Sequence, residues 1–288
     1  QNSFLQCYFD TNESELTFEK LANYEEYNLV RYNFFAASNF LFKNQNDKAK
    51  KIIKNAREKF NSNLLLKETE YLINNGNEKK IKNFFDCQNE TDIVAEFFYI
   101  MANLHSGEQQ YKLSNFYLKI SLLLNKKFIS NRTLLAENYY YQKKYNLSHK
   151  EYNSLKTIGP AYSWYASTSI ATILLETNGK EFSITNLEKE FNSLKNPTFE
   201  QYYELANFYK NNDYFKQSIK YYSLALNILK KEHTLVPKIF DRRGTSYERV
   251  GEWEKAEADL LESLRLLPDQ PHVLNYLGYS WIDKGINL

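Results

Sequence analysis

Small side chains recur along the chain at a nearly constant interval, and we call these positions anchors. The steps between them are 65, 34, 35, 35, 38 and 34 residues, and the anchors are Ala37, Ala102, Ala136, Ala171, Ala206, Gly244 and Gly278. The first step is about two periods long, so one copy in that stretch has no convincing anchor. An interval of this length is typical of proteins built from repeated helix pairs.

Further positions of constant size stand at fixed distances from the anchors. Twelve residues after the first six anchors the residue is always Ala or Ser: Ala49, Ser114, Ser148, Ser183, Ser218 and Ala256. Three residues after the anchors nearly all are bulky: Phe40, His105, Tyr139, Leu174, Tyr209, Tyr247 and Trp281. Sixteen residues after them stand Ile53, Leu118, Tyr152, Leu187, Tyr222 and Leu260. Small residues let two helices approach closely and large ones fill the gaps, so the pattern predicts packed helix pairs.

Glycines and prolines mark where these helices end. Gly244 and Gly251 are seven residues apart, as are Gly278 and Gly285, and the two pairs are 34 residues apart. Proline ends or begins a helix because it lacks an amide proton and clashes with the preceding turn. In one copy the pattern predicts a helix over 199–210 followed by an antiparallel helix over 215–229.

The last copies resemble the tetratricopeptide repeat (TPR) family. The residues that carry this resemblance are Phe240, Gly244, Tyr247, Gly251, Trp253, Ala256, Leu260, Leu264 and Pro268, then Leu274, Leu277, Gly278, Trp281 and Gly285. The resemblance implies an all-α fold, a right-handed solenoid of antiparallel helix pairs whose concave wall is formed by the first helix of each pair. Arg243 departs from the family's usual apolar residue, and Ser263 departs from its usual Ala.

The resemblance extends over residues 30–288. We expect copies at about 30–62, 63–94 (degenerate), 95–128, 129–163, 164–198, 199–236, 237–270 and 271–288 (incomplete). Residues 1–29 are expected to form a helical cap that includes Phe18, Leu21 and Tyr24. The last, unfinished copy would expose Leu274, Leu277 and Trp281, so we expect the natural protein to continue beyond Leu288 or this helix to self-associate.

Composition and charge narrow the class of function. Lys+Arg is 37 and Asp+Glu is 35, a formal charge of +2, which argues against a nucleic-acid binder driven by bulk charge. No apolar run approaches the roughly 18 residues of a membrane-spanning helix. The basic run 48–59 alternates with Ala49, Ile52, Ile53 and Ala56 at helical spacing, so we interpret it as a solvated helix face with these four residues on the buried side. Contact with anionic lipid or nucleic acid is the alternative.

Residue patterns typical of catalysis and metal binding are missing from the sequence. The four histidines form no close metal-ligand pair, and His105 falls at a packing position. Phosphate-binding loops and nucleophile elbows do not occur, so we expect no cofactor, no metal and no enzymatic activity. The spacing of Cys7 and Cys87 does not decide whether they are bridged, and the unbridged state is favoured because two cysteines do not make a disulfide framework.

The candidate binding site is the concave wall. Residues three before and one after each anchor are expected to point inward and to bind a protein or peptide: Tyr99, Asn103, Thr133, Glu137, Thr168, Thr172, Tyr203, Asn207, Asp241, Thr245, Asn275 and Tyr279, with Phe34 and Ser38 in the first copy. These side chains are mostly uncharged and bring contact area and hydrogen bonds. Lys238, Arg242 and Arg249 are confined to one copy, so the family's clamp for a carboxylate tail is not expected.

The leading interpretation is therefore a non-catalytic scaffold or adaptor for a protein partner. The segment from Asp241 to Leu288 also resembles exported proteobacterial TPR proteins, among them outer-membrane lipoproteins that act as adaptors for periplasmic proteases. That resemblance implies a periplasmic or outer-membrane location, with the cytoplasm as the alternative. Two rival functions are a regulatory arm of a larger enzyme and an RNA-binding helical repeat, which would need a basic groove.

Overall fold

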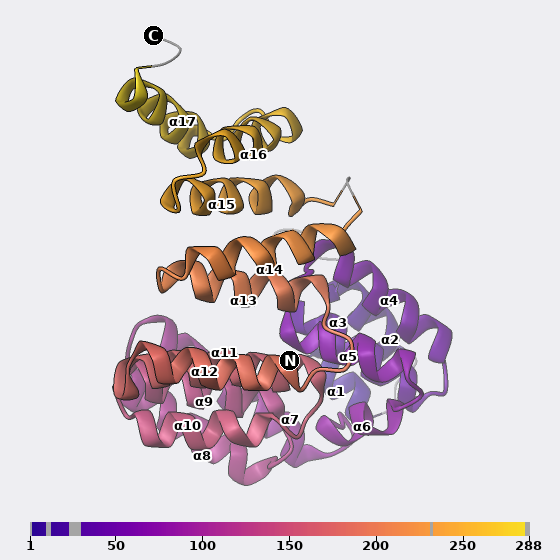
Figure 1. Cartoon of the computed structure of the whole chain (residues 1–288). Helices are drawn as coiled ribbons and strands as arrows, with labels where there is room; N and C mark the ends of the chain where they lie inside the picture. Colours follow the sequence, from indigo (N-terminus) through magenta and orange to yellow (C-terminus); the bar gives the residue numbers. More distant parts are fainter. Residues whose placement is uncertain (1, 10–12, 23–29, 231–232, 286–288) are drawn as a thin grey trace. The chain divides into compact units, whose positions relative to one another are not determined.

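Helix is the only regular secondary structure in the part of the chain that the structure describes. The computed structural model describes residues 2–9, 13–22, 30–230 and 233–285, which form seventeen α-helices and no strand (Figure 1). The all-α helical-repeat fold predicted from the sequence is confirmed. Two compact units divide the chain, unit 1 (Gln1–Thr177) and unit 2 (Asn178–Leu288).

Unit 1 consists of eleven helices, the last of which ends at the boundary between the units: α1 (Asn2–Tyr8), α2 (Glu13–Ala22), α3 (Val30–Phe42), α4 (Asn46–Lys59), α5 (Leu64–Asn74), α6 (Glu78–Phe84), α7 (Glu90–Gly107), α8 (Tyr111–Leu124), α9 (Ile129–Tyr141), α10 (Tyr145–Leu155) and α11 (Pro160–Asn178). Unit 2 contains α12 (Lys180–Asn192), α13 (Phe199–Asn211), α14 (Phe215–Ile228), α15 (Val236–Arg249), α16 (Trp253–Leu266) and α17 (Pro271–Lys284). The pair predicted over 199–210 and 215–229 matches α13 and α14 to within one residue.

The anchors lie where the two helices of a pair touch. Ala102, Ala136 and Ala206 are completely buried, and so are the small residues twelve positions later, such as Ser114 and Ser148. The Ser114 hydroxyl donates to the Ala102 carbonyl at 2.7 Å, and the Ser148 hydroxyl donates to the Ala136 carbonyl at 2.8 Å. A buried hydroxyl needs such a partner, so serine here joins the second helix to the first as well as keeping them close.

The same backbone turn recurs along the chain after the first helix of a pair, although the residue type at this turn varies. Positive φ angles occur at Asn44, Gly76, Gln109, Lys143, Gly179, Asp213, Gly251 and Gly285. Six of these residues lie seven positions after an anchor and Gly179 lies eight after, while Gly76 lies seven after Thr69. Thr69 is 2% exposed and is the missing anchor of the degenerate copy, which α5 and α6 occupy.

The N-terminal helices cover an aromatic cluster, as expected of a cap. Phe18 is 1% exposed, and the ring of Phe4 lies 5.6 Å from it and 5.0 Å from Phe35. Tyr24, also expected in this cap, lies outside the described residues.

Cys7 and Cys87 form a buried disulfide with a Cα–Cα distance of 5.8 Å, so the expectation of unbridged cysteines is wrong. Chain folding brings these residues together across 80 positions, and no local sequence pattern records that proximity. The bond joins α1 to the segment after α6.

A contact between distant copies is present inside unit 1. Glu68 on α5 is 1% exposed, and its carboxylate accepts a hydrogen bond from the backbone N–H of Ala161 at the start of α11, at 3.0 Å. A carboxylate is stabilised by the free amides at a helix N-terminus. Gly159 precedes that helix, and any larger side chain there would collide with the Glu68 carboxylate.

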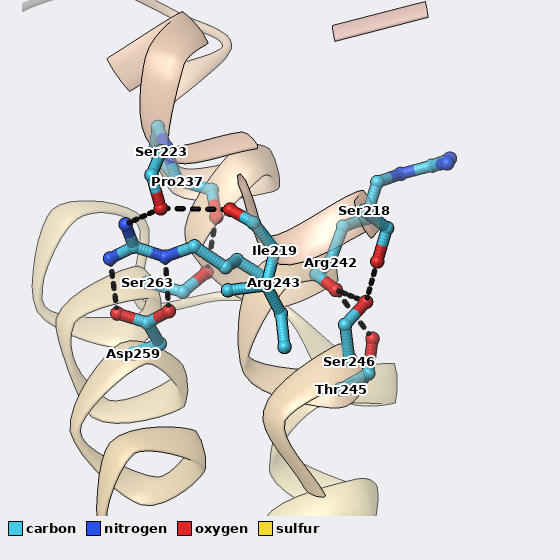
Figure 2. A network of polar contacts seen from close by, with 10 residues as sticks. All are labelled: Ser218, Ile219, Ser223, Pro237, Arg242, Arg243, Thr245, Ser246, Asp259 and Ser263. Atoms are coloured by element: carbon cyan, nitrogen blue, oxygen red, sulfur yellow. Dashed lines mark hydrogen bonds and ion pairs between the residues drawn. The ribbon is translucent and has the colours of Figure 1, made fainter. Parts of the chain in front are cut away.

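In unit 2 the unusual Arg243 is part of a polar network between α14, α15 and α16. Its guanidinium donates to both carboxylate oxygens of Asp259 at 2.7 and 2.8 Å and to the Ser223 hydroxyl at 2.9 Å (Figure 2). Ser263, the other departure from the TPR pattern, donates to the Pro237 carbonyl at 2.8 Å. Both departures are explained by satisfied hydrogen bonds.

The last helix is better covered than the sequence analysis expected. Leu277 is 2% exposed and packs with Leu260, and the Trp281 indole donates to the Glu257 carboxylate at 2.5 Å. The prediction that α17 exposes Leu277 is therefore wrong, because α16 covers that side of the helix. Leu274 and Ile282 remain 52% and 65% exposed, and self-association through them stays a prediction.

Candidate functional site

A groove of unit 2 runs along the first helices of its last copies. It has a volume of about 920 Å³ and is lined from α13, α15 and α17 and by the first residue of α14, with loop residues at its ends. Lys238, Asp241, Thr245 and Arg249 follow one another at three or four residues along α15, and Arg242 is next to Asp241. Residues at this spacing share one face of a helix, so α15 presents a continuous charged row to the groove.

Cations in this groove outnumber the carboxylates that are free to pair with them. Lys210, Lys238 and Arg242 form no ion pair with any described residue. Among the three acids of the lining, Asp213 is bonded to Lys180 at 2.9 Å, Asp241 lies 3.2 Å from His272, and Asp269 stands at the end of the groove. This groove of unit 2 is thus lined by charged side chains, whereas the sequence analysis described the predicted wall as mostly uncharged.

The cations are close enough to influence one another. Burial lowers the pKa of Lys210, and the positive charges of Arg242 and Arg249 lower it further, while Asp241 acts in the opposite direction. Like charges held close together, with fewer carboxylates than cations around them, favour the binding of an anion.

Two of the predicted residues position one of these cations. Asn207 accepts a hydrogen bond from the Arg242 guanidinium at 2.6 Å and a second from the Tyr222 hydroxyl at 2.7 Å. The guanidinium lies 5.7 Å from the centre of the Tyr203 ring, a cation–π distance. Tyr203 and Asn207 therefore hold Arg242 in place, and Asp241 and Thr245 line the groove beside it.

Unit 1 contains a smaller pocket of about 370 Å³ on its inner wall. Four predicted residues line it together: Tyr99, Asn103, Thr133 and Glu137. The pocket also contains Arg31, whose guanidinium is bonded to Glu96 at 2.5 Å and lies 4.0 Å from the centre of the Tyr99 ring. This buried ion pair on α3 and α7 was not identified in the sequence, because the partners are 65 residues apart.

The remaining predicted residues line neither hollow. Thr168 and Thr172 donate to carbonyls of their own helix, those of Tyr165 and Thr168, at 2.9 and 3.1 Å. Asn275 is exposed and Tyr279 is 75% exposed, away from the groove lining. In the first copy Phe34 and Ser38 are buried, so they are core residues and not surface ones.

Lys210, His272 and Tyr276 line the groove and were missed as site residues. The available signal was the position of Lys210, four residues after the anchor Ala206 and three after the predicted Asn207. Residues at this spacing share a helix face with the predicted wall, so the rule of one and three residues around an anchor was too narrow.

His105 and the basic residues of α4 lie as the sequence analysis predicted. His105 stacks on Tyr117 with ring centres 5.5 Å apart, consistent with its packing role. On α4 the basic side chains Lys48, Lys50, Lys51 and Lys54 are exposed, opposite Ala49, Ile53 and Ala56.

The described residues form neither a metal-binding cluster nor a helix suited to crossing a membrane. They contain no group of three or more potential metal ligands. Among the helices described above, none combines the length and apolar character that crossing a membrane requires.

No family model matches the chain, and a search of the curated proteins found no relative. Its structure is similar to that of YrrB, a TPR protein with an unusual peptide-binding site (15% identity, 66% of this chain and 93% of that chain, TM-score 0.42). It is also similar to MamA from Desulfovibrio magneticus RS-1 (15%, 62% and 97%, 0.44) and to the Cut9–Hcn1 complex of APC/C (13%, 99% and 57%, 0.48). These sequence identities and TM-scores are too low to add to the fold argument made above from the helices.

Proposed function

We propose that this chain is a non-catalytic scaffold that holds a segment of another protein on the inner wall of its helix pairs. The observation that carries the proposal is the groove of unit 2, where Lys210, Lys238 and Arg242 face a hollow of about 920 Å³ without an ion-paired carboxylate. Unpaired cations in an open groove are stabilised by an anionic ligand. The partner segment accordingly carries Asp or Glu side chains.

Two arginines contribute differently to this binding. Arg242 is fixed by Asn207 and Tyr203 before any ligand arrives, so little side-chain entropy is lost when it pairs with a carboxylate. Its planar guanidinium can donate two parallel hydrogen bonds to one carboxylate. Arg249, which is more exposed, extends the cationic row toward the end of α15.

Fluorescence polarisation with three labelled, capped peptides tests this proposal. One peptide alternates Asp and Glu with Gly and Ser, the second has Asn and Gln instead, and the third has Lys. We expect binding of the acidic peptide alone, weakened at least about tenfold by Arg242→Gln and progressively by added salt. The matched control is Arg265→Gln, an exposed arginine on α16 that pairs with Glu262 outside the groove.

The outcome also separates the rival functions. Equal binding of all three peptides, or no effect of Arg242→Gln, would contradict the proposal. Tighter binding of a labelled single-stranded RNA than of the acidic peptide would favour the RNA-binding alternative, because the same cations would then contact phosphates.

We further propose that the protein works in an oxidising compartment of the cell envelope. The buried Cys7–Cys87 disulfide supports this location, since such bonds persist in secreted and periplasmic proteins and are rare in the cytosol. Mass spectrometry of the protein from its native cells, with free thiols alkylated at lysis, would test it. We expect Cys7 and Cys87 to be unmodified and linked; alkylation of both would place the protein in a reducing compartment.

A further inference from the structure

The pocket of unit 1 contains a carboxylate that lacks a counter-charge. The Glu137 Oε1 atom accepts a hydrogen bond from the Tyr165 hydroxyl at 2.5 Å, while Oε2 has no hydrogen bond and no ion pair within the described part of the chain. Burial raises the pKa of Glu137, and the hydrogen bond from Tyr165 offsets only part of that effect. Burying a charge without a partner costs free energy, and such groups are frequent at functional sites.

The one cation of this pocket is already neutralised. Arg31 pairs with Glu96, which is 4% exposed, and its guanidinium also lies 5.0 Å from the centre of the Phe128 ring. The same guanidinium therefore does not compensate Glu137. Because Glu96 balances Arg31, the carboxylate of Glu137 has no cation of the pocket lining left to pair with it.

The pocket also offers hydrogen-bond acceptors and an apolar channel. Tyr162 is 2% exposed and lines the pocket, yet its hydroxyl forms no hydrogen bond with any residue that the structure describes. The Ser130 hydroxyl lines the same space. Leu65 and Leu134 add apolar walls, on which the hydrocarbon stem of a long side chain can lie.

We propose that this pocket binds one cationic side chain, lysine or arginine, of a protein segment lying on the inner wall of unit 1. The cationic head pairs with Glu137 and donates to the hydroxyl oxygens of Tyr162 and Ser130, while the stem packs on Leu65 and Leu134. An acidic side chain is rejected by the same carboxylate. This inference rests on the proposed function for the partner being a protein, but it uses different residues from the groove of unit 2, so either can fail alone.

Saturation-transfer NMR with small probes tests the pocket without knowledge of the partner. The probes are the N-acetyl N-methylamides of lysine, arginine, norleucine and glutamate. We expect signal transfer to the lysine or arginine probe and none to norleucine, which has the stem without the charge, or to glutamate. Equal signals from norleucine and the cationic probes, or a signal from glutamate, would overturn the proposal.

Three variants link the signal to the pocket. Glu137→Gln keeps the acceptor for Tyr165 and should weaken the cationic probe at least about tenfold. Asn103→Lys changes an exposed pocket residue, so it leaves the core intact and places a competing ammonium beside Glu137. Glu176→Gln removes an exposed carboxylate of the same unit and should bind as the unaltered protein does. Unchanged binding by Glu137→Gln would overturn the proposal, whatever the acidic peptide does at unit 2.

Discussion

The inner walls of the two units follow one repeat pattern but carry opposite unpaired charges. In unit 2 the cations Lys210, Lys238 and Arg242 have no ion-pair partner among the described residues, whereas in unit 1 the group without a counter-charge is Glu137. The alanine anchors Ala102, Ala136, Ala171 and Ala206 are completely buried in both units. The repeat pattern therefore specifies how helices pack and leaves the wall free to vary, so binding specificity has to be determined copy by copy.

The cores of the two units also differ in what stabilises them. Unit 1 has a cluster of aromatic rings, in which Phe35 lies 4.7 Å from Phe85, and a disulfide beside it. Unit 2 has an ion pair between the partly buried Arg243 and the buried Asp259. Trp164 belongs to unit 1 and Trp253 and Trp281 to unit 2, so single-tryptophan backgrounds allow the stability of each unit to be measured separately.

The largest effect is expected from Arg243→Met, which leaves the Asp259 carboxylate buried and unpaired. We expect a loss of about 3–5 kcal/mol from the free energy of unfolding, measured in urea by the fluorescence of Trp253. The double variant Arg243→Met, Asp259→Leu should recover most of that loss, because no charge then remains buried. If both variants are equally destabilised, packing and not charge pairing explains the effect.

Removing the disulfide should destabilise unit 1 by a somewhat smaller amount. We expect Cys7→Ser with Cys87→Ser to lose about 2–4 kcal/mol, since the bond restricts the unfolded chain over a separation of 80 residues. The readout is urea unfolding followed at Trp164, with Trp253 as the internal control for unit 2. An equal shift of both tryptophans would contradict the division into separately stabilised units.

Ala256→Trp tests the register of the repeat in unit 2. Ala256 is completely buried, and its carbonyl would lie 3.1 Å from a side-chain carbon added at Gly244 on the facing helix. Overpacking of this kind costs about 1–3 kcal/mol. The unfolding midpoint should fall, with the exposed Glu254→Gln on the same helix as the control that leaves it unchanged. An unchanged midpoint for Ala256→Trp would show that the assigned register is wrong.

The smallest effect is a gain of stability. Since burial raises the pKa of Glu137 in the folded state, the stability of the protein is highest below the unfolded-state pKa and falls as the pH rises through the folded-state value. Glu137→Gln should therefore be more stable than the unaltered protein at neutral pH, by less than about 1 kcal/mol, and equal to it in acid. A variant that is less stable at neutral pH would show that Glu137 is a structural residue and not a binding one.

Much of the packing was predictable from the sequence because buried positions are constrained in size. Ala102, Ala136 and Ala206 are all at zero exposure, as the 34-residue interval required. The turns were harder to identify, since Gln109, Lys143 and Asp213 adopt the same positive φ as Gly76, Gly179 and Gly251. A conformation shared by different side chains leaves no residue pattern. The degenerate copy at 63–94 was predicted without an anchor, because Thr69 stands where the other copies have Ala or Gly.

The candidate site was less predictable than the fold. Tyr99, Asn103, Thr133 and Glu137 do line one pocket, because they follow the helical repeat. Which charges remain unpaired depends on partners far away in the sequence, such as Glu96 for Arg31, and on burial. Neither quantity can be obtained from the spacing of residues along one helix.

The hydrogen bond from Ala161 to Glu68 has a consequence for how this protein can evolve and fold. Repeat proteins ordinarily gain or lose whole copies by duplication and deletion, because each copy contacts only its neighbours. Here α5 is fastened to the start of α11 across 93 residues, so removing one intervening helix pair would separate the carboxylate from its amide. We infer that the number of copies between them is fixed by selection, and that this stretch folds as one cooperative body, more slowly than a chain of neighbour contacts would.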